Sequence, residues 1–162
     1  MRLQLPVKFC GRCRQWPESF FDFEHPLTSS QPFGFKDTSF KAAGGVEGIR
    51  KLVDDFYDIM DASPQTRVIR GMHTTDLDVT RDKLARFLSG WLGGPRLFRE
   101  KYGAISITGV HGHLDIGEHE RDAWLGCMEQ AIAKQDYSED FSVYLLEQLG
   151  VPAERIRVFC EI

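Results

Sequence analysis

The stretch GVEGIRKLVDDFYDIM, residues 45–60, has the clearest periodic pattern in this 162-residue chain. Its apolar residues recur every three or four positions, which places them along one face of a helix. They are Ile49, Leu52, Val53, Phe56, Tyr57 and Met60. The aspartates between them face elsewhere, so the pattern predicts an amphipathic helix from Gly45 to Asp61. Ser63 can cap the helix that follows, and Pro64 suits its first position.

The same period predicts two more long helices further along the chain. One covers residues 79–92 and is stopped by the Gly-Gly-Pro sequence directly after it. The other covers residues 118–134, where an acidic first turn suits the positive end of the helix dipole. A shorter helix is expected at 140–149, with a last short turn restarting at Val151. Only residues 103–108 alternate as a strand would, and too briefly, so the sequence predicts an all-α fold.

The N-terminal part of the chain lacks this period. Residues 1–36 are rich in Pro, Ser and Phe, and Pro17, Pro26 and Pro32 interrupt them. Such interruptions are typical of irregular structure with little helix. We therefore expect an irregular N-terminal extension of residues 1–36 and one helical domain of residues 37–162, which is long enough for a single core.

Composition excludes several classes of protein. Hydrophobic residues make up 42% of the chain, charged residues 27%, and the formal net charge is -4. These values are ordinary for a globular protein, and the negative charge argues against a nucleic-acid or anionic-membrane partner. No apolar run approaches the roughly 20 residues of a membrane span. The first residues also lack the apolar stretch of a signal peptide, so the sequence predicts a cytoplasmic location.

The histidines and aromatic residues are ambiguous when taken alone. His111 and His113 stand two positions apart, and on a helix such a pair would point in nearly opposite directions. Zinc would require further ligands at a suitable spacing, and none is present. Tyr57 and Trp124 lie on apolar helical faces, where an aromatic side chain is ordinarily part of the core.

The four cysteines are equally ambiguous. Cys10 and Cys13 form a CxxC pair that resembles half of a zinc site or a redox pair, although no second CxxC accompanies it. Cys127 lies on an apolar helical face and is expected in the core, while Cys160 has no evident role. The residues by themselves therefore indicate a helical domain and no particular function.

Short motifs that follow one another in a set order take the interpretation further. They are AAGG at 42–45, FY at 56–57, MHTTDL at 72–77, RDKLARFLSGWLGGP at 81–95, VH at 110–111, Ile116 and ERDAWLGCM at 120–128. This order resembles the group II truncated haemoglobins over residues 37–158. The resemblance implies a truncated globin fold, in which a two-over-two helical sandwich surrounds haem b.

The resemblance also implies which residues serve the haem. The family's proximal histidine lies five residues before an Ile and thirteen before a Trp, and His111 fits both spacings. It is therefore the implied iron ligand, and His113 is not. The residues implied to face the bound ligand are Tyr57, His73, Thr80 and Trp124. The residues implied to contact the haem, besides His111, are Lys83 at a propionate and Leu84, Phe87 and Ile116 at the ring.

Two classes of function follow from this resemblance. The first is binding of O2, NO or a related diatomic ligand, with the indole N–H of Trp124 and the phenol of Tyr57 as hydrogen-bond donors. The second is a redox enzyme, either a nitric oxide dioxygenase or a peroxidase-like enzyme, which would need an external reductase. A haem-free helical interaction module is a third alternative. The sequence leaves open whether the protein is a monomer or a homodimer.

Overall fold

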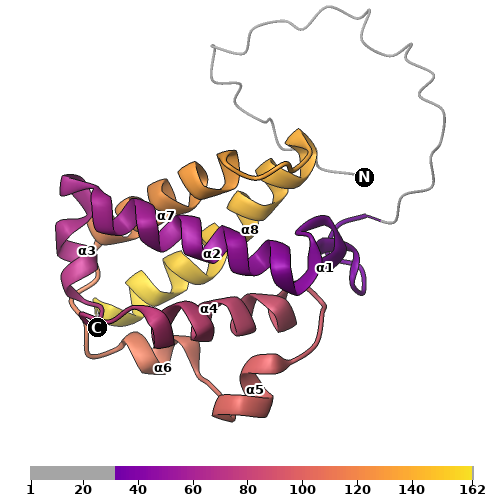
Figure 1. Ribbon diagram of the computed structural model, residues 1–162. Coiled ribbons are helices and arrows are strands. Elements are labelled where there is room, and N and C mark those ends of the chain that lie inside the picture. Colours follow the sequence, from indigo (N-terminus) through magenta and orange to yellow (C-terminus); the bar gives the residue numbers. More distant parts are fainter. Residues whose placement is uncertain (1–31, 162) are drawn as a thin grey trace, which may run out of the picture. The chain divides into compact units, whose positions relative to one another are not determined.

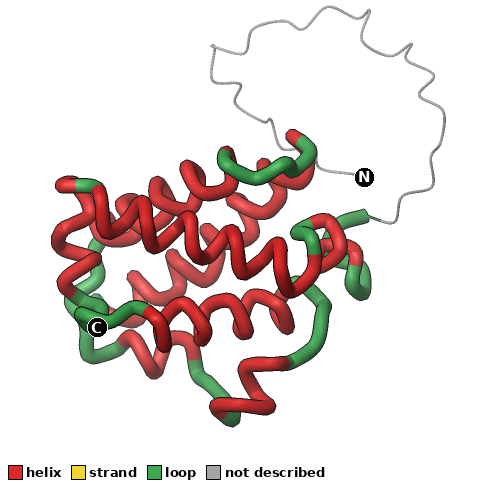
Figure 2. Tube along the Cα trace, viewed as in Figure 1, coloured by secondary structure: helices red, strands yellow, loops and turns green. Residues whose placement is uncertain are grey.

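The computed structural model describes residues 32–161, and all regular structure in that range is helical (Figure 2). In chain order the elements are α1 (Thr38–Ala42), α2 (Gly45–Ala62), the 3-10 turn η2 (Pro64–Thr66), α3 (Arg67–Gly71), α4 (Asp78–Trp91), α5 (Leu97–Tyr102), α6 (Ile107–His111), α7 (Glu118–Ala133) and α8 (Glu139–Cys160). The all-α prediction is confirmed. Residues 1–31, with the CxxC pair of Cys10 and Cys13, lie outside the described residues.

Two helix pairs make up the described part of the chain (Figure 1). α2 packs against α4 and also against α7, and α7 packs in turn against α8. The pairs α2 with α4 and α7 with α8 form the expected two-over-two arrangement. The short helices α5 and α6 connect α4 to α7, and α6 packs against α8. No helix among residues 32–161 is long and apolar enough to cross a membrane.

The core forms on the predicted apolar face of α2. All six residues of that face are buried, and Phe56 and Ile49 are 0% exposed. Burying a side chain of this size contributes about 1.5–3 kcal/mol. α2 packs against both α4 and α7. Its apolar face therefore lies at the centre of the core. Cys127 on α7 is 1% exposed, as expected of a core residue.

The end of α4 depends on packing as well as on chain geometry. Gly93 has a φ of 93°, and a Cβ there would lie 1.8 Å from the carbonyl oxygen of Lys36. The backbone N–H of Phe40 donates to the carbonyl of Leu92 at 3.0 Å. Only glycine fits position 93, because the segment before α1 runs directly over the end of α4.

Two local predictions are wrong. The chain does not break near Val151, since α8 continues from Glu139 to Cys160 with Pro152 inside it. Pro152 removes one backbone hydrogen bond. The turns after it contact other helices, through the ion pair of Glu154 with Arg121 on α7 and the contact of Cys160 with the carbonyl of His111 on α6. Ser63 does not cap the next helix, because its hydroxyl donates instead to the side-chain carbonyl of Gln65 at 2.6 Å.

Candidate functional site

An aromatic cluster joins α2 to α7. The ring of Phe56 lies 4.8 Å from that of Tyr57 and 5.2 Å from that of Trp124, measured between centroids. Phe56 and Tyr57 are buried, whereas Trp124 is half-buried. The cluster therefore places the side chains of Tyr57 and Trp124 around one shared phenyl ring.

His73 completes this cluster from the segment after α3. Its ring meets the ring of Tyr57 edge to face at 5.5 Å. Its Nδ1 lies 2.8 Å from the carbonyl oxygen of Ile69, which can only accept, so Nδ1 carries the proton. Burial lowers the pKa of His73, and the positive charge of Arg70 lowers it further, against the opposing effect of the Ile69 carbonyl. The imidazole is therefore neutral near pH 7, and its Nε2 is free.

His111 is the last residue of α6 and has the same local geometry. Its Nδ1 lies 2.7 Å from the carbonyl oxygen of Ile107, four residues earlier. This contact fixes the ring and leaves Nε2 to bind another group, which is the arrangement expected of a metal-ligating histidine. The carbonyl of His111 in turn accepts from the backbone N–H of Leu114 at 2.9 Å and from the thiol of Cys160 at 3.4 Å.

The donors of the aromatic cluster have no hydrogen-bond partner among the described residues. Within residues 32–161, neither the hydroxyl of Tyr57 nor Nε1 of Trp124 makes a hydrogen bond, although Tyr57 is only 3% exposed. A fully enclosed donor without a partner would be costly, and the described residues contain no such enclosed atom. Both groups therefore keep some contact with solvent.

Burial also sets the protonation state of Tyr57. It raises the pKa of the phenol well above its usual range, and the charge of Arg81 opposes this only in part. Tyr57 therefore keeps its proton at any physiological pH and can serve as a hydrogen-bond donor.

The other predicted site residues make contacts of their own. The hydroxyls of Thr80 and Thr74 are 3.5 Å apart, and Nζ of Lys83 lies 5.5 Å from the ring centroid of Tyr102. Leu84 and Phe87 on α4 pack against the core, and Ile116 is half-buried between α6 and α7. Phe87 also lines a groove of about 380 Å³ between α4 and α5. Among the described residues, no ring contact or hydrogen bond joins these five to the aromatic cluster.

Two residues near the site carried no signal in the sequence. The guanidinium of Arg81 lies over the ring of Tyr57, 5.6 Å from its centroid. The thiol of Cys160 contacts the carbonyl oxygen of His111 at 3.4 Å. Arg81 is the first residue of the motif at 81–95 but has no implied role there, and Cys160 belongs to no motif. Both contacts join segments far apart in the sequence, so only the folded chain reveals them.

The comparisons with known proteins agree on one family. The sequence model described as "Bacterial-like globin" matches residues 38–154. The chain is 30% identical over 112 residues to the group 2 truncated hemoglobin YjbI of Bacillus subtilis (strain 168), a match that covers 69% of this chain and 83% of that protein.

Solved structures give the same result. The cold-adapted truncated hemoglobin of Pseudoalteromonas haloplanktis TAC125 matches with a TM-score of 0.70 and 30% identity, covering 73% of this chain and 95% of that one. The group II 2-on-2 hemoglobin of Agrobacterium tumefaciens matches with a TM-score of 0.71 and 27% identity, covering 81% and 98%.

This chain belongs to the bacterial-like globin family, and its resemblance to the group II truncated haemoglobins is confirmed. Membership makes it a haem protein with haem b as its cofactor, and it binds small diatomic ligands at the haem. The residues present fit such a group. Within residues 32–161, one imidazole nitrogen of His111 on α6 has no hydrogen-bond partner, and neither do the donors of Tyr57 on α2 and Trp124 on α7.

Proposed function

We propose that this protein binds O2 and related diatomic ligands at a haem that His111 holds, with Tyr57 and Trp124 as donors to the bound ligand. The observation that carries the proposal is the pair of unpartnered donors around Phe56. Nothing in the described core uses these two polar groups, although each comes from a long helix that packs into it. A ligand of partial negative charge would supply the acceptor that both lack.

His111 would hold the iron through Nε2. Its Nδ1–H bond to the carbonyl of Ile107, at 2.7 Å, holds the ring in one orientation and keeps the lone pair on Nε2. When bound, haem supplies an iron with an axial position open to diatomic ligands. His73 and Thr80 would border the space for that ligand, and His73 is held by the carbonyl of Ile69.

Four residues would contact the haem itself. Leu84 and Phe87 come from the inner side of α4, and Ile116 comes from the segment between α6 and α7. They would supply apolar walls that exclude water. Lys83 is exposed and makes no ion pair with any residue in the range 32–161, so its ammonium group is free to pair with a propionate.

The test of the proposal is a comparison of His111→Ala with His113→Ala. We expect the wild-type protein to show a haem absorption spectrum, His111→Ala to lose haem or bind it weakly, and His113→Ala to keep the wild-type spectrum. The reverse pattern would show that the wrong histidine has been assigned. A purified protein that takes up no haem would favour the interaction module instead.

The enzymatic alternative uses the same residues and is separated from ligand binding by kinetics. Mixing the O2-loaded protein with nitric oxide in stopped flow measures the dioxygenase reaction directly. Sustained turnover would require an external reductase, so a binder is expected to react at most once per haem. Many turnovers with a supplied reductant would make the protein an enzyme.

A further inference from the structure

Arg81 on α4 occupies an unusual place for an arginine. Its side chain is only 16% exposed. Its guanidinium lies over the ring of Tyr57, 5.6 Å from the centroid, which is within the range of a cation–π contact. Arg81 is therefore the charged group that contacts the ring of a proposed ligand donor from the neighbouring helix.

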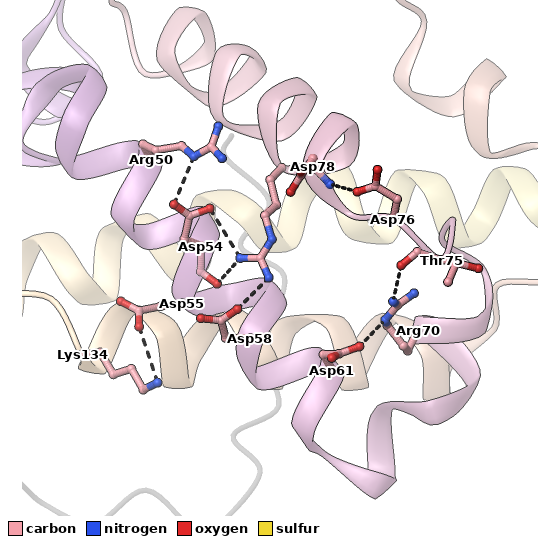
Figure 3. A network of polar contacts seen from close by, with 11 residues as sticks. Arg50, Asp54, Asp55, Asp58, Asp61, Arg70, Thr75, Asp76, Asp78 and Lys134 are labelled. Atoms are coloured by element: carbon pink, nitrogen blue, oxygen red, sulfur yellow. Dashed lines mark hydrogen bonds and ion pairs between the residues drawn. The ribbon is translucent and has the colours of Figure 1, made fainter.

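Three acceptors on α2 fix the position of this guanidinium. One of its terminal nitrogens donates to the backbone carbonyl of Asp54 at 2.7 Å, and lies 3.4 Å from the carboxylate of the same residue. The other donates to the carboxylate of Asp58 at 2.6 Å. In Figure 3, dashed contacts run from Asp54 and from Asp58 on α2 to the guanidinium group that lies between them. Because the guanidinium group is planar, these acceptors fix its orientation as well as its position.

Tyr57 depends on its neighbours for its own orientation. Its hydroxyl makes no hydrogen bond with any residue from 32 to 161, so only ring packing fixes the direction of the O–H group. Besides Phe56, the ring contacts His73 edge to face at 5.5 Å and Arg81 at 5.6 Å. A cation over a phenol also draws electron density from the ring and makes the O–H a stronger donor.

We propose that Arg81 is a positioning residue for Tyr57, which holds the phenol in place and strengthens its hydrogen bond to a ligand bound in the pocket. The inference rests on the proposed function, since it acts through the donor assigned there. The ion pair between α2 and α4 would then affect how long a diatomic ligand stays bound.

The test compares Arg81→Gln with Arg50→Gln, alone and together with Tyr57→Phe. Arg50 is a matched control because it pairs with the same carboxylate of Asp54, at 3.1 Å, and contacts no part of Tyr57. One net hydrogen bond corresponds to about fivefold in a rate, so partial loss through Arg81→Gln is expected to speed O2 release roughly two- to threefold. Arg50→Gln should leave the rate unchanged.

A spectroscopic measurement separates positioning from general loosening of the fold. Carbon monoxide is the probe, because a donor that hydrogen-bonds to it lowers its C–O stretching frequency. Arg81→Gln should shift that band toward the position found in Tyr57→Phe. Arg81→Lys, which keeps the charge but loses the fork, should fall between Arg81→Gln and wild type.

The inference requires that the effect of Arg81→Gln disappear when Tyr57 is already Phe. An equal effect in both backgrounds would overturn it, because Arg81 would then act elsewhere. Tyr57→Phe with a clear effect and Arg81→Gln with none would overturn the inference while leaving the proposed donors intact. No effect of Tyr57→Phe would remove the proposed donor role and the inference with it. If Arg81→Gln fails to fold, Asp58→Asn removes one of its anchors and is read in the same way.

Discussion

Removing the two proposed donors one at a time is the most direct perturbation of the site. Tyr57→Phe deletes one hydroxyl and keeps the ring, while Trp124→Phe deletes the indole N–H and keeps an aromatic group beside Phe56. Neither donor has a protein acceptor among residues 32–161. The substitutions therefore leave no buried acceptor unpaired, and their effect on ligand release reports the lost hydrogen bond itself.

The magnitude follows from the value of a single hydrogen bond. A net contribution of about 1 kcal/mol corresponds to about fivefold faster O2 release for each substitution. Independent donors would give about 25-fold in the double variant. The rings of Tyr57 and Trp124 both pack on Phe56, at 4.8 and 5.2 Å, so the two sites are coupled. We expect the double variant to depart from the product of the single effects by about twofold.

The assay is O2 release from the ferrous protein in stopped flow, with Tyr137→Phe as the control. The hydroxyl of Tyr137 donates to the carbonyl of Ala43 at 3.3 Å, away from the aromatic cluster. That variant should lose stability and keep the wild-type release rate. Release rates within twofold of wild type for both single variants and for the double variant would refute the donor assignment.

Three further predictions concern stability and the limits of the site. Gly94→Ala should lower the melting temperature by several degrees, because its Cβ would lie 2.3 Å from the ring of Phe40 and such overpacking costs about 1–3 kcal/mol. Hydrogen bonds from Arg157 and Arg121 lower the pKa of Glu154 to about 2. The stabilisation it gives is therefore complete above the unfolded pKa of about 4.3 and is lost as the pH falls toward 2. Glu154→Gln should thus have a lower melting temperature than wild type at pH 6 and the same melting temperature as wild type near pH 2. Removal of residues 1–31 should leave the haem spectrum and the O2 release rate unchanged, since Phe33, which packs 5.1 Å from Phe141, is kept.

Each of these has a distinct contrary outcome. Gly94→Ala with wild-type melting would mean that the segment of α1 moves aside at no cost. If Glu154→Gln lowers the melting temperature equally at pH 6 and near pH 2, the stabilisation by Glu154 does not depend on its ionisation. A changed spectrum after removal of residues 1–31, or in the double variant Cys10→Ser, Cys13→Ser, would make the extension part of the functional site.

The long helices could be predicted because their apolar periods are strong. α2, α4 and α7 begin and end within about one residue of the expected positions. α8 could not be predicted as one helix, since Pro152 ordinarily interrupts a helix and its continuation depends on tertiary contacts. One of these is the ion pair of Glu154 with Arg121 on α7.

The candidate site was predictable only in part. Tyr57 and Trp124 lie on apolar faces and by themselves indicate core residues. Their assignment came from the order of motifs along the chain. The role of Arg81 could not be found in this way, although the residue opens one of the motifs, because its contacts with Asp58 and Tyr57 join two helices and depend on their packing. Local patterns report helices, whereas the contacts that orient a donor arise only when the helices meet.

The contact between α8 and α6 connects the last turn of α8 to His111, the proposed iron ligand. α6 is only five residues long, and on its own such a segment has no stability as a helix. Phe159 closes over Gly112, where a Cβ would lie 2.6 Å from its ring, and Cys160 donates to the carbonyl of His111. The position of His111 therefore depends in part on Phe159 and Cys160, which lie about fifty residues later in the chain. Local unfolding of that turn, for example after oxidation of the Cys160 thiol, would therefore displace the imidazole of His111.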